Sequence, residues 1–393
     1  MNTPKIRFKG FEDDWEQRKL GEVVGIYDGV HQTPQYQDSG IMFLSVENIT
    51  TLKSEKYISE EAFERDYKVY PEKGDILMTR IGDVGTTNVV QTKEKVAFYV
   101  SLALLKPKEI NSYFLSNAMK TSVFQKGLRE RTLVTAIPQK INKDEIGRVN
   151  VFITNNAEEQ KKIGDYFTAL DHLITLHQRK CDETKQLKKF MLQKMFPKNG
   201  EKNPKIRFEG FTDDWEQRKL GDVFKEYSEK HHEELPALTI VQGGGTIFRE
   251  ESDRSLQYDK SNLSGYKMVK KDDFIVHLRS FEGGLEKANS DGIISPAYHT
   301  MHGDNVDSRF YYPYFRSYDF INRKLVAHVY GIRDGRSIDI DGMKSIEIPY
   351  TSYEEQKTIG DYLDSLDHLI TLHQRKCEKL KELKKYMLHN MFV

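Results

Sequence analysis

The sequence predicts a mixed α/β protein with a pseudo-twofold internal repeat, in which an antiparallel two-helix coiled coil separates two globular domains. Three observations support this fold class: two segments occur twice almost letter for letter, the longer one carries a heptad pattern, and the regions between them resemble strands with short helices. The expected boundaries are 1–157 for the first globular domain, 158–197 for the central long helix, 198–353 for the second domain and 354–393 for the C-terminal long helix.

The repeated segments come in a fixed order. PKIRFKGFEDDWEQRKLGEVV at residues 4–24 returns as PKIRFEGFTDDWEQRKLGDVF at residues 204–224, and we call each copy a lead segment. EEQKKIGDYFTALDHLITLHQRKCDETKQLKKFMLQKMF at residues 158–196 returns as EEQKTIGDYLDSLDHLITLHQRKCEKLKELKKYMLHNMF at residues 354–392. The chain therefore consists of two copies of one plan, each with a lead segment, a variable region and a long helix.

The variable regions, 26–156 and 226–353, share only a faint skeleton. KGDILMTRIGDVGT at 73–86 resembles KDDFIVHLRSFEGG at 271–284, and RVNVFIT at 148–154 resembles SIEIPYT at 345–351. Alternating or short β-branched runs bounded by Gly and Asp are typical of strands and turns. Helices are expected at 60–67, across 113–131 and across 311–329.

The long segments carry apolar or semi-apolar residues at alternating spacings of four and three, which is typical of a coiled-coil seam. A helix of about 35 residues is about 50 Å long and needs a partner, and the obvious partner is its own copy. The second lead segment directly follows the first helix, so the first lead segment should dock at the end of the second helix. Only antiparallel helices allow this, and the two domains should then lie at opposite ends of a helical spacer. His177 and His373 are expected to be seam residues that fix the register.

Composition narrows the class of protein. The chain has 60 Lys and Arg against 60 Asp and Glu, so any nucleic-acid surface must come from local clustering of charge. No apolar run is long enough for a membrane helix, and we expect a cytoplasmic protein without membrane contact. Cys181 and Cys377 occupy equivalent repeat positions, which favours packed thiols over a disulfide framework or metal site. The last turns of both long helices are basic; part of this charge complements the helix dipole, and our hypothesis is that some of these side chains also contact nucleic-acid phosphates.

The duplicated plan resembles the specificity subunits of type I restriction-modification systems along the whole chain. The matching motifs are DWEQRKLGEV and DWEQRKLGDV, EEQKKIGDYFTALD and EEQKTIGDYLDSLD, GDILMTRIGDVG, and SPAY at 295–298. DDFIVHLRSFEGG matches the same strand and loop element, but it departs from the glycine-bearing pattern at Asp272 and at 278–281.

The resemblance implies a target recognition domain in each variable region, reading one half of a bipartite double-stranded DNA sequence, with the helices setting the unread spacer. It implies two modification subunits that use S-adenosylmethionine and two restriction subunits that use ATP and Mg. This chain itself is expected to hold no cofactor or metal and to be no enzyme, because methyltransferase and phosphate-loop motifs are missing and the glycines at 82–85 and 243–245 fit turns. The alternative is a non-enzymatic coiled-coil scaffold presenting two protein-binding domains.

The candidate DNA contacts are chosen by residue type, since Arg, Lys, Asn and Gln read base edges while Ser and Thr also position phosphates. In the first domain they are Ser45, Asn48, Arg80, Thr86, Thr87, Asn88, Gln139 and Lys140. In the second they are Gln242, Arg249, Arg279, Lys287, Arg333 and Arg336.

Overall fold

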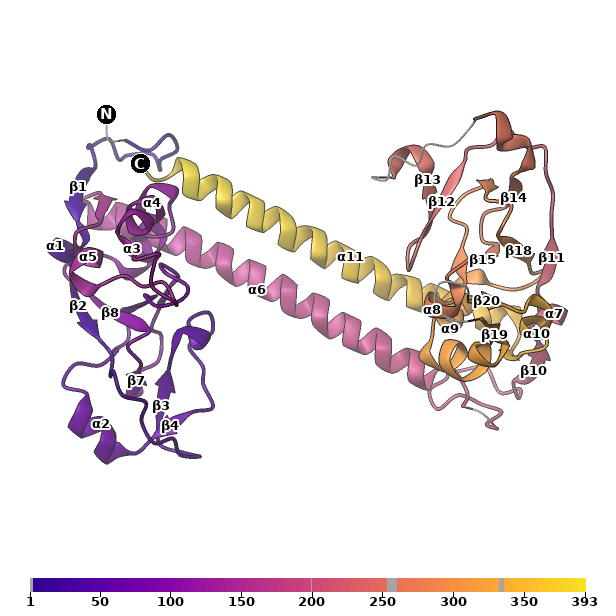
Figure 1. Cartoon of the computed structure of the whole chain (residues 1–393), viewed down its shortest axis with the longest axis horizontal. Helices are drawn as coiled ribbons and strands as arrows, with labels where there is room; N and C mark the ends of the chain where they lie inside the picture. The colour runs from indigo at the N-terminus through magenta and orange to yellow at the C-terminus, as the bar shows by residue number, and fades with distance from the viewer. Residues whose placement is uncertain (1–2, 199, 253–259, 332–335) are drawn as a thin grey trace. The chain divides into compact units, whose positions relative to one another are not determined.

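The structure, a computed structural model, describes residues 3–198, 200–252, 260–331 and 336–393. The chain divides into two compact units, unit 1 from Met1–Gln178 with Gln374–Val393 and unit 2 from Arg179–His373. Each unit combines one globular body with a part of each long helix (Figure 1). The four-part division of the chain by sequence stays a prediction, because the units group helix segments with the bodies on which they pack.

Unit 1 contains one set of short strands and helices. Its strands are β1 (Glu16–Lys19), β2 (Val24–Asp28), β3 (Ile41–Leu44), β4 (Tyr57–Ile58), β5 (Ile76–Thr79), β6 (Thr87–Val89), β7 (Val96–Phe98), β8 (Leu102–Pro107) and β9 (Asn150–Ile153). Its helices are α1 (Leu20–Val23), α2 (Glu60–Asp66), α3 (Ser112–Ala118), α4 (Ser122–Arg131) and α5 (Lys143–Gly147), with a 3-10 turn η1 (Val46–Asn48).

The main sheet of unit 1 is antiparallel, with strand order β2-β8-β5-β6. A smaller sheet, β4-β3-β7, contains one parallel pair, and β1 pairs with β9. Strand β5 is buried along its whole length, as expected for a central strand covered on both faces. The helix expected at 60–67 and the strand expected at 148–154 are confirmed as α2 and β9.

Unit 2 is built on the same plan. Its strands are β10 (Glu216–Lys219), β11 (Lys225–Tyr227), β12 (Leu238–Val241), β13 (Gly245–Phe248), β14 (Lys267–Val269), β15 (Phe274–Val276), β16 (Glu286–Lys287), β17 (Gly292–Ile294), β18 (His299–His302), β19 (Val329–Tyr330), β20 (Ser337–Ile338) and β21 (Glu347–Tyr350). Its helices are α7 (Leu220–Val223), α8 (Ser280–Gly283), α9 (Ser308–Phe315) and α10 (Ile340–Lys344), with helical turns η2 (Arg249–Glu251), η3 (Lys260–Gly265), η4 (Phe320–Lys324) and η5 (Leu325–His328).

The two main sheets correspond strand for strand. The order β11-β18-β15-β16 in unit 2 repeats β2-β8-β5-β6 in unit 1, and β10 pairs with β21 as β1 pairs with β9. Around this shared sheet the units differ: unit 1 adds the β4-β3-β7 sheet, whereas unit 2 adds the hairpin β12-β13 and the pairs β14-β17 and β19-β20. The predicted skeleton of two related α/β domains is therefore confirmed.

The long helices are α6 (Ala157–Lys194) and α11 (Tyr353–Asn390), of 38 residues each. Within unit 1, Lys384 Nζ lies 2.5 Å from Asp171 Oδ1, and the Cys377 thiol lies 3.9 Å from the carbonyl oxygen of Ile174. Within unit 2, Lys188 Nζ lies 2.6 Å from Asp367 Oδ2, and the Cys181 thiol lies 3.9 Å from the carbonyl oxygen of Ile370. Residue numbers rise along one helix as they fall along the other, which confirms antiparallel packing. Both cysteines are buried thiols, as predicted.

The lead segments dock as the antiparallel arrangement requires. In unit 1 the Ile6 N–H donates to the carbonyl oxygen of Asn390 at 2.9 Å, and in unit 2 the Ile206 N–H donates to that of Lys194 at 3.0 Å. The orphan carbonyls at the end of each long helix are thereby paired with backbone, which satisfies acceptors that a helix leaves open. The predicted docking of residues 4–24 at the end of the second helix is confirmed.

Each lead segment also brings an arginine to the start of a long helix. Arg7 forms a bidentate pair with the buried Glu159, at 2.6 and 2.9 Å. Arg207 forms the same pair with the buried Glu355, at 2.7 and 2.9 Å. These charge-assisted contacts between remote parts of the chain fix the lead segment of each unit against the start of a long helix.

Two expected helices are interrupted, so the predictions of single helices across 113–131 and 311–329 were wrong. The first is split into α3 and α4, because the Thr121 hydroxyl accepts the Phe124 N–H and starts a new helix. The second ends at α9 and resumes as η4 and η5, after the Ser317 hydroxyl accepts the Phe320 N–H at 3.2 Å. Side-chain caps of this kind compete with the continuing helix.

Candidate nucleic-acid interface

An exposed polar edge in unit 1 is formed by two loops. The Gly82 N–H donates to the Gln139 carbonyl oxygen at 2.9 Å, and Gln139 Nε2 donates back to the Gly82 carbonyl oxygen at 2.9 Å. Lys140 pairs with Ile81 in an isolated bridge. Gln139 and Lys140 are exposed, and Thr86 lies half-buried on the first of these loops. The structure therefore brings together three of the candidate residues, Thr86, Gln139 and Lys140.

Arg80 lies beneath this edge. Its side chain is buried and forms an ion pair with Asp28, while its backbone N–H donates to the Ser101 carbonyl oxygen at 2.9 Å. Burial lowers the pKa of the Arg80 guanidinium, because desolvation disfavours the charged form. This buried ion pair holds the start of the loop in place. The Arg80 side chain is therefore not available for a contact with DNA, unlike the exposed side chains beside it.

A second group in unit 1 surrounds the 3-10 turn η1. The Ser45 N–H donates to Asn48 Oδ1 at 2.9 Å, and the Ser45 hydroxyl completes the cap. Asn88 Nδ2 donates to the carbonyl oxygens of Ile49 and Thr50, at 2.9 and 3.1 Å. Ser45, Asn48 and Asn88 thus act together to hold one turn. Thr87 lies apart from them, because it is buried and its hydroxyl lies 3.0 Å from that of Ser116.

In unit 2, three candidates gather around the short helix α8. Arg279 is exposed at its N-terminal end. Arg336 donates to Glu282 Oε1 at 3.0 Å, and its guanidinium lies 4.4 Å from the centroid of the Phe281 ring. Gln242 packs directly on Gly283, since a Cβ added there would lie 2.2 Å from Gln242 Nε2. Gln242, Arg279 and Arg336 therefore form the candidate reading surface of this unit.

The turn that carries Gln242 is held by a buried carboxylate. Glu286, on strand β16, accepts the N–H groups of Gly243 and Gly245 at 2.7 and 3.1 Å. It also accepts the Tyr312 hydroxyl at 2.6 Å and pairs with Arg316. Burial, followed by this carboxylate, raises the pKa of the Tyr312 hydroxyl. Sequence reasoning missed this group, because the two-residue strand Glu286–Lys287 carries no apolar pattern that would mark the glutamate as buried.

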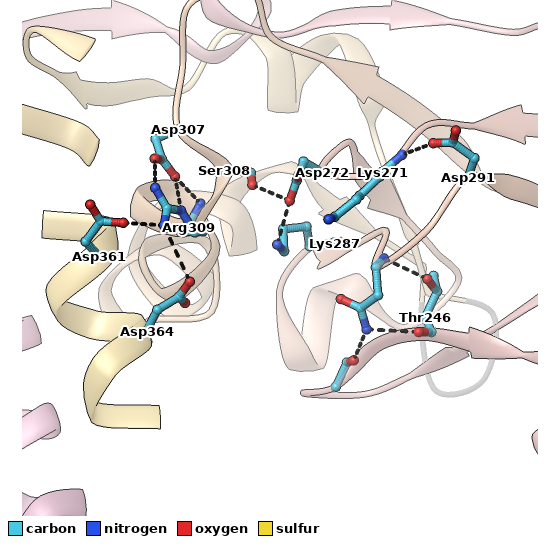
Figure 2. A network of polar contacts seen from close by, with 12 residues as sticks. Thr246, Lys271, Asp272, Lys287, Asp291, Asp307, Ser308, Arg309, Asp361 and Asp364 are labelled. Atoms are coloured by element: carbon cyan, nitrogen blue, oxygen red, sulfur yellow. Dashed lines mark hydrogen bonds and ion pairs between the residues drawn. The ribbon is translucent and has the colours of Figure 1, made fainter. Parts of the chain in front are cut away.

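The other candidates of unit 2 are engaged elsewhere in the fold. Lys287 Nζ lies 2.7 Å from Asp272 Oδ1, which also accepts the Ser308 hydroxyl at 2.9 Å (Figure 2). Arg249 lies over the Tyr266 ring, 5.5 Å from its centroid. Arg333 lies outside the described residues.

Beside Lys287, a second network ties the start of α9 to α11. Arg309 pairs with Asp307 at 2.5 Å, with Asp361 and, at 3.8 Å, with Asp364 (Figure 2). These carboxylates raise the pKa of Arg309, and the Asp307 hydrogen bond is the largest contribution. The network fixes α9 on the long helix and so positions the sheet that carries Lys287.

One scaffold that occurs twice and presents a different set of polar side chains each time defines a class of protein, a tandem recognition protein with two non-equivalent reading surfaces. Within the described ranges, every helix is too short or too polar to span a lipid bilayer.

Comparison with known proteins identifies the family. A family model described as the type I restriction modification DNA specificity domain matches residues 12–186 and 212–382. The chain therefore belongs to this family, carries two of its target recognition domains, and is a specificity subunit of a type I restriction-modification system.

Similar proteins are found among both sequences and structures. The MjaX and MjaVIII type I restriction enzyme specificity subunits of Methanocaldococcus jannaschii are 24% and 23% identical, over 99% and 96% of this chain and 95% and 92% of theirs. The crystal structure of a type I restriction-modification S subunit from M. genitalium aligns over 100% of this chain and 99% of that one, with a TM-score of 0.64 and 14% identity. That likeness supports the fold.

Proposed function

We propose that each target recognition domain reads one half of a bipartite DNA sequence, the first through residues near Thr86, Gln139 and Lys140 and the second through Gln242, Arg279 and Arg336. The observation that carries this proposal is the duplicated sheet with different loops. Loops on a rigid scaffold are where binding residues concentrate, and two different loop sets on one scaffold suit two different half-sites. Exposed Gln, Lys and Arg side chains supply the donors and acceptors that base edges require.

The long helices are the proposed spacer ruler. Their antiparallel contacts within each unit, through Lys384 and Asp171 or Lys188 and Asp367, support a fixed register between them. A fixed register would set the number of unread base pairs between the half-sites, because a continuous helix has a constant rise per residue.

We further propose that the chain is not catalytic and holds no cofactor. Two modification subunits would transfer methyl groups from S-adenosylmethionine to adenine, and two restriction subunits would use ATP and Mg for cleavage, all in the cytoplasm, where the DNA lies. The missing methyltransferase and phosphate-loop motifs support this division of labour.

The test is a domain exchange in cells that contain the modification subunit. Residues 26–156 are replaced by the equivalent region of a relative with a different specificity, and methyladenine is mapped across the genome. The proposal expects a split motif in which one half changes while the other half and the spacer length persist. Replacement of residues 226–353 is the matched control and should change the opposite half. Methylation that is unaltered by both exchanges would favour a scaffold that presents protein-binding domains.

A further inference from the structure

A cavity of about 890 Å³ opens in unit 1, at a place that the proposed reading loops do not use. It lies between the last turns of α11, the junction of α3 and α4, and α6 at Asp171 and Ile174. The end of α11 lies against α3 and α4 in Figure 1. Its basic lining residues are Lys5, Lys120, Lys381, Lys384, Lys385 and His389.

The positive charge of this cavity is poorly compensated. Asp171 is the one acidic side chain among the lining residues, and it pairs with Lys384 at 2.5 Å; Val393, whose main-chain carboxylate is the other anionic group, also lines the cavity. In the described part of the chain, Lys5, Lys120, Lys381 and Lys385 form no ion pair with a carboxylate within 4.0 Å. Closely spaced cations of this kind attract anions, and more strongly where water is partly excluded.

Lys120 makes the imbalance most evident. The pKa of its ammonium group is lowered to about 8, mainly by burial and also by Lys384, while Asp171 acts in the opposite direction. A bound anion would stabilise the charged form of Lys120 and relieve this penalty.

The N-terminus of α4 faces the same cavity. Thr121 and Ser122 line it, and α4 has 10 residues, so its positive dipole end adds to the lysine charges. Lysines around a helix N-terminus favour a phosphate group over a neutral ligand.

Helix α4 also connects the cavity to the reading edge of unit 1. Gln125 Nε2 donates to the carbonyl oxygen of Gly85 at 3.0 Å and to that of Met119 at 2.8 Å. The first turn of α4 therefore supports both the loop at 82–86 and the cavity lined by Thr121.

We propose that this cavity binds a backbone phosphate of the DNA, next to the half-site read by unit 1. The inference rests on the proposed function and adds to it a contact that is independent of base sequence. DNA supplies phosphates at regular spacing along each strand, and lysines that neutralise them contribute affinity without specificity.

Unit 2 carries different residues at the corresponding junction. Arg316 stands in the position of Lys120, but Glu286 engages its guanidinium. Asp319 stands in the position of Val123 and adds a carboxylate. The proposed phosphate contact is therefore confined to unit 1, and unit 2 offers matched controls for it.

The experiment compares two sets of substitutions in the complex with the modification subunits. One variant carries K120Q, K381Q and K385Q, which leaves the pair between Lys384 and Asp171 in place; the control carries K185Q and K189Q, the counterparts of the last two in unit 2. Affinity for specific and unrelated duplexes is measured across salt concentrations. The triple variant should bind both duplexes about tenfold more weakly, with the slope of log K against log salt reduced by roughly 1 to 2, whereas the control keeps the wild-type slope. If the triple variant misfolds, the single variant K385Q replaces it. In K385Q the slope of log K against log salt should fall by about 1 at most.

Several outcomes would overturn the inference. An unchanged salt slope in both lysine variants would exclude the DNA contact, and so would a defect only in assembly with the modification subunit, which points to an acidic protein segment. Inorganic phosphate that shifts the Lys120 signal in NMR spectra, while DNA binding keeps its slope, would assign the cavity to a small phosphate ligand. The methylated motif separates the two proposals: a split motif with an unchanged slope refutes the cavity alone, and no split motif refutes the proposed function.

Discussion

Asn88 in unit 1 and Glu286 in unit 2 occupy the same position of the same sheet, opposite Leu77 on β5 and Ile275 on β15. The amide of Asn88 donates to two carbonyl oxygens of one turn, whereas the carboxylate of Glu286 accepts two N–H groups of another. The scaffold thus offers one anchoring position, and the residue placed there decides which kind of turn it can hold. A loop transferred to the other unit without its anchoring residue would face an acceptor where it needs a donor, or the reverse. We therefore expect whole domains, and not single loops, to be exchangeable.

The largest expected effect concerns the buried carboxylates at the starts of the long helices. Glu355 accepts Arg207, Trp215 at 3.0 Å and the Thr351 hydroxyl, whereas Trp15 Nε1 has no hydrogen-bond partner in the described part of unit 1. Glu355→Ala should lower the free energy of unfolding by roughly 3 to 5 kcal/mol, since it breaks the ion pair of the half-buried Arg207 and leaves the buried Trp215 N–H without its acceptor. Glu159→Ala should cost about 1 kcal/mol less, for lack of the tryptophan contact. Urea denaturation of both variants measures the difference; equal losses would contradict the asymmetry.

The anchoring position itself is the second test. Glu286→Gln removes the charge that faces Arg316 and should cost roughly 2 to 4 kcal/mol, with loss of methylation specified by the second half-site. Asn88→Asp places a carboxylate against two carbonyl oxygens and should cost about 1 to 3 kcal/mol, with the first half-site affected. Thermal denaturation and methyladenine mapping provide the readouts. If either variant alters both half-sites equally, the anchors do not act within their own units.

The third test uses the pH dependence of Lys120, whose position is occupied by Arg316 in unit 2. The pKa of Lys120 in the fold is lowered to about 8, below the ordinary value of 10.5, so the folded state binds the proton less tightly than the unfolded state. Burial of the charged ammonium group therefore lowers the free energy of unfolding. This loss is complete below pH 8 and disappears as the pH rises toward 10.5. Between pH 8 and 10.5, the free energy of unfolding of the wild type should rise by about 2 to 3 kcal/mol relative to that of K120M. Parallel pH profiles of unfolding for the two proteins would show that Lys120 is not buried as described.

The smallest effect is expected along the helix pair, where the units are alike. Lys384→Ala and Lys188→Ala each remove one partly exposed ion pair, and each should cost less than about 1 kcal/mol. High salt should reduce both effects. A markedly larger loss for one variant, measured by urea denaturation, would mean that the two halves of the helix pair are energetically different.

The sequence predicted the parts of the fold that depend on repeated residues. Nearly identical lead segments and long helices dock in the same way, so the antiparallel pairing and the docking of Ile6 at Asn390 followed from connectivity alone. The division of α3 from α4 did not follow, because the cap at Thr121 competes with a continuing helix through a single hydroxyl.

The candidate site was less accessible to sequence reasoning. Thr86, Gln139 and Lys140 were identified by residue type and do lie together, but Arg80 and Lys287 are held in ion pairs whose partners, Asp28 and Asp272, carry no local signal. The basic cavity combines residues from both ends of the chain. Only the folded structure brings Lys5, Lys120 and Lys385 together.

The buried thiols turn the helix pair into its own reporter. The sulfur of Cys377 faces Ile174 within unit 1, and that of Cys181 faces Ile370 within unit 2. An alkylating reagent can reach either sulfur only when the two helices separate locally, since the thiolate and not the buried thiol reacts. The labelling rates of Cys377 and Cys181 therefore report the rates of local opening of the helix pair in unit 1 and in unit 2 separately, without any added probe.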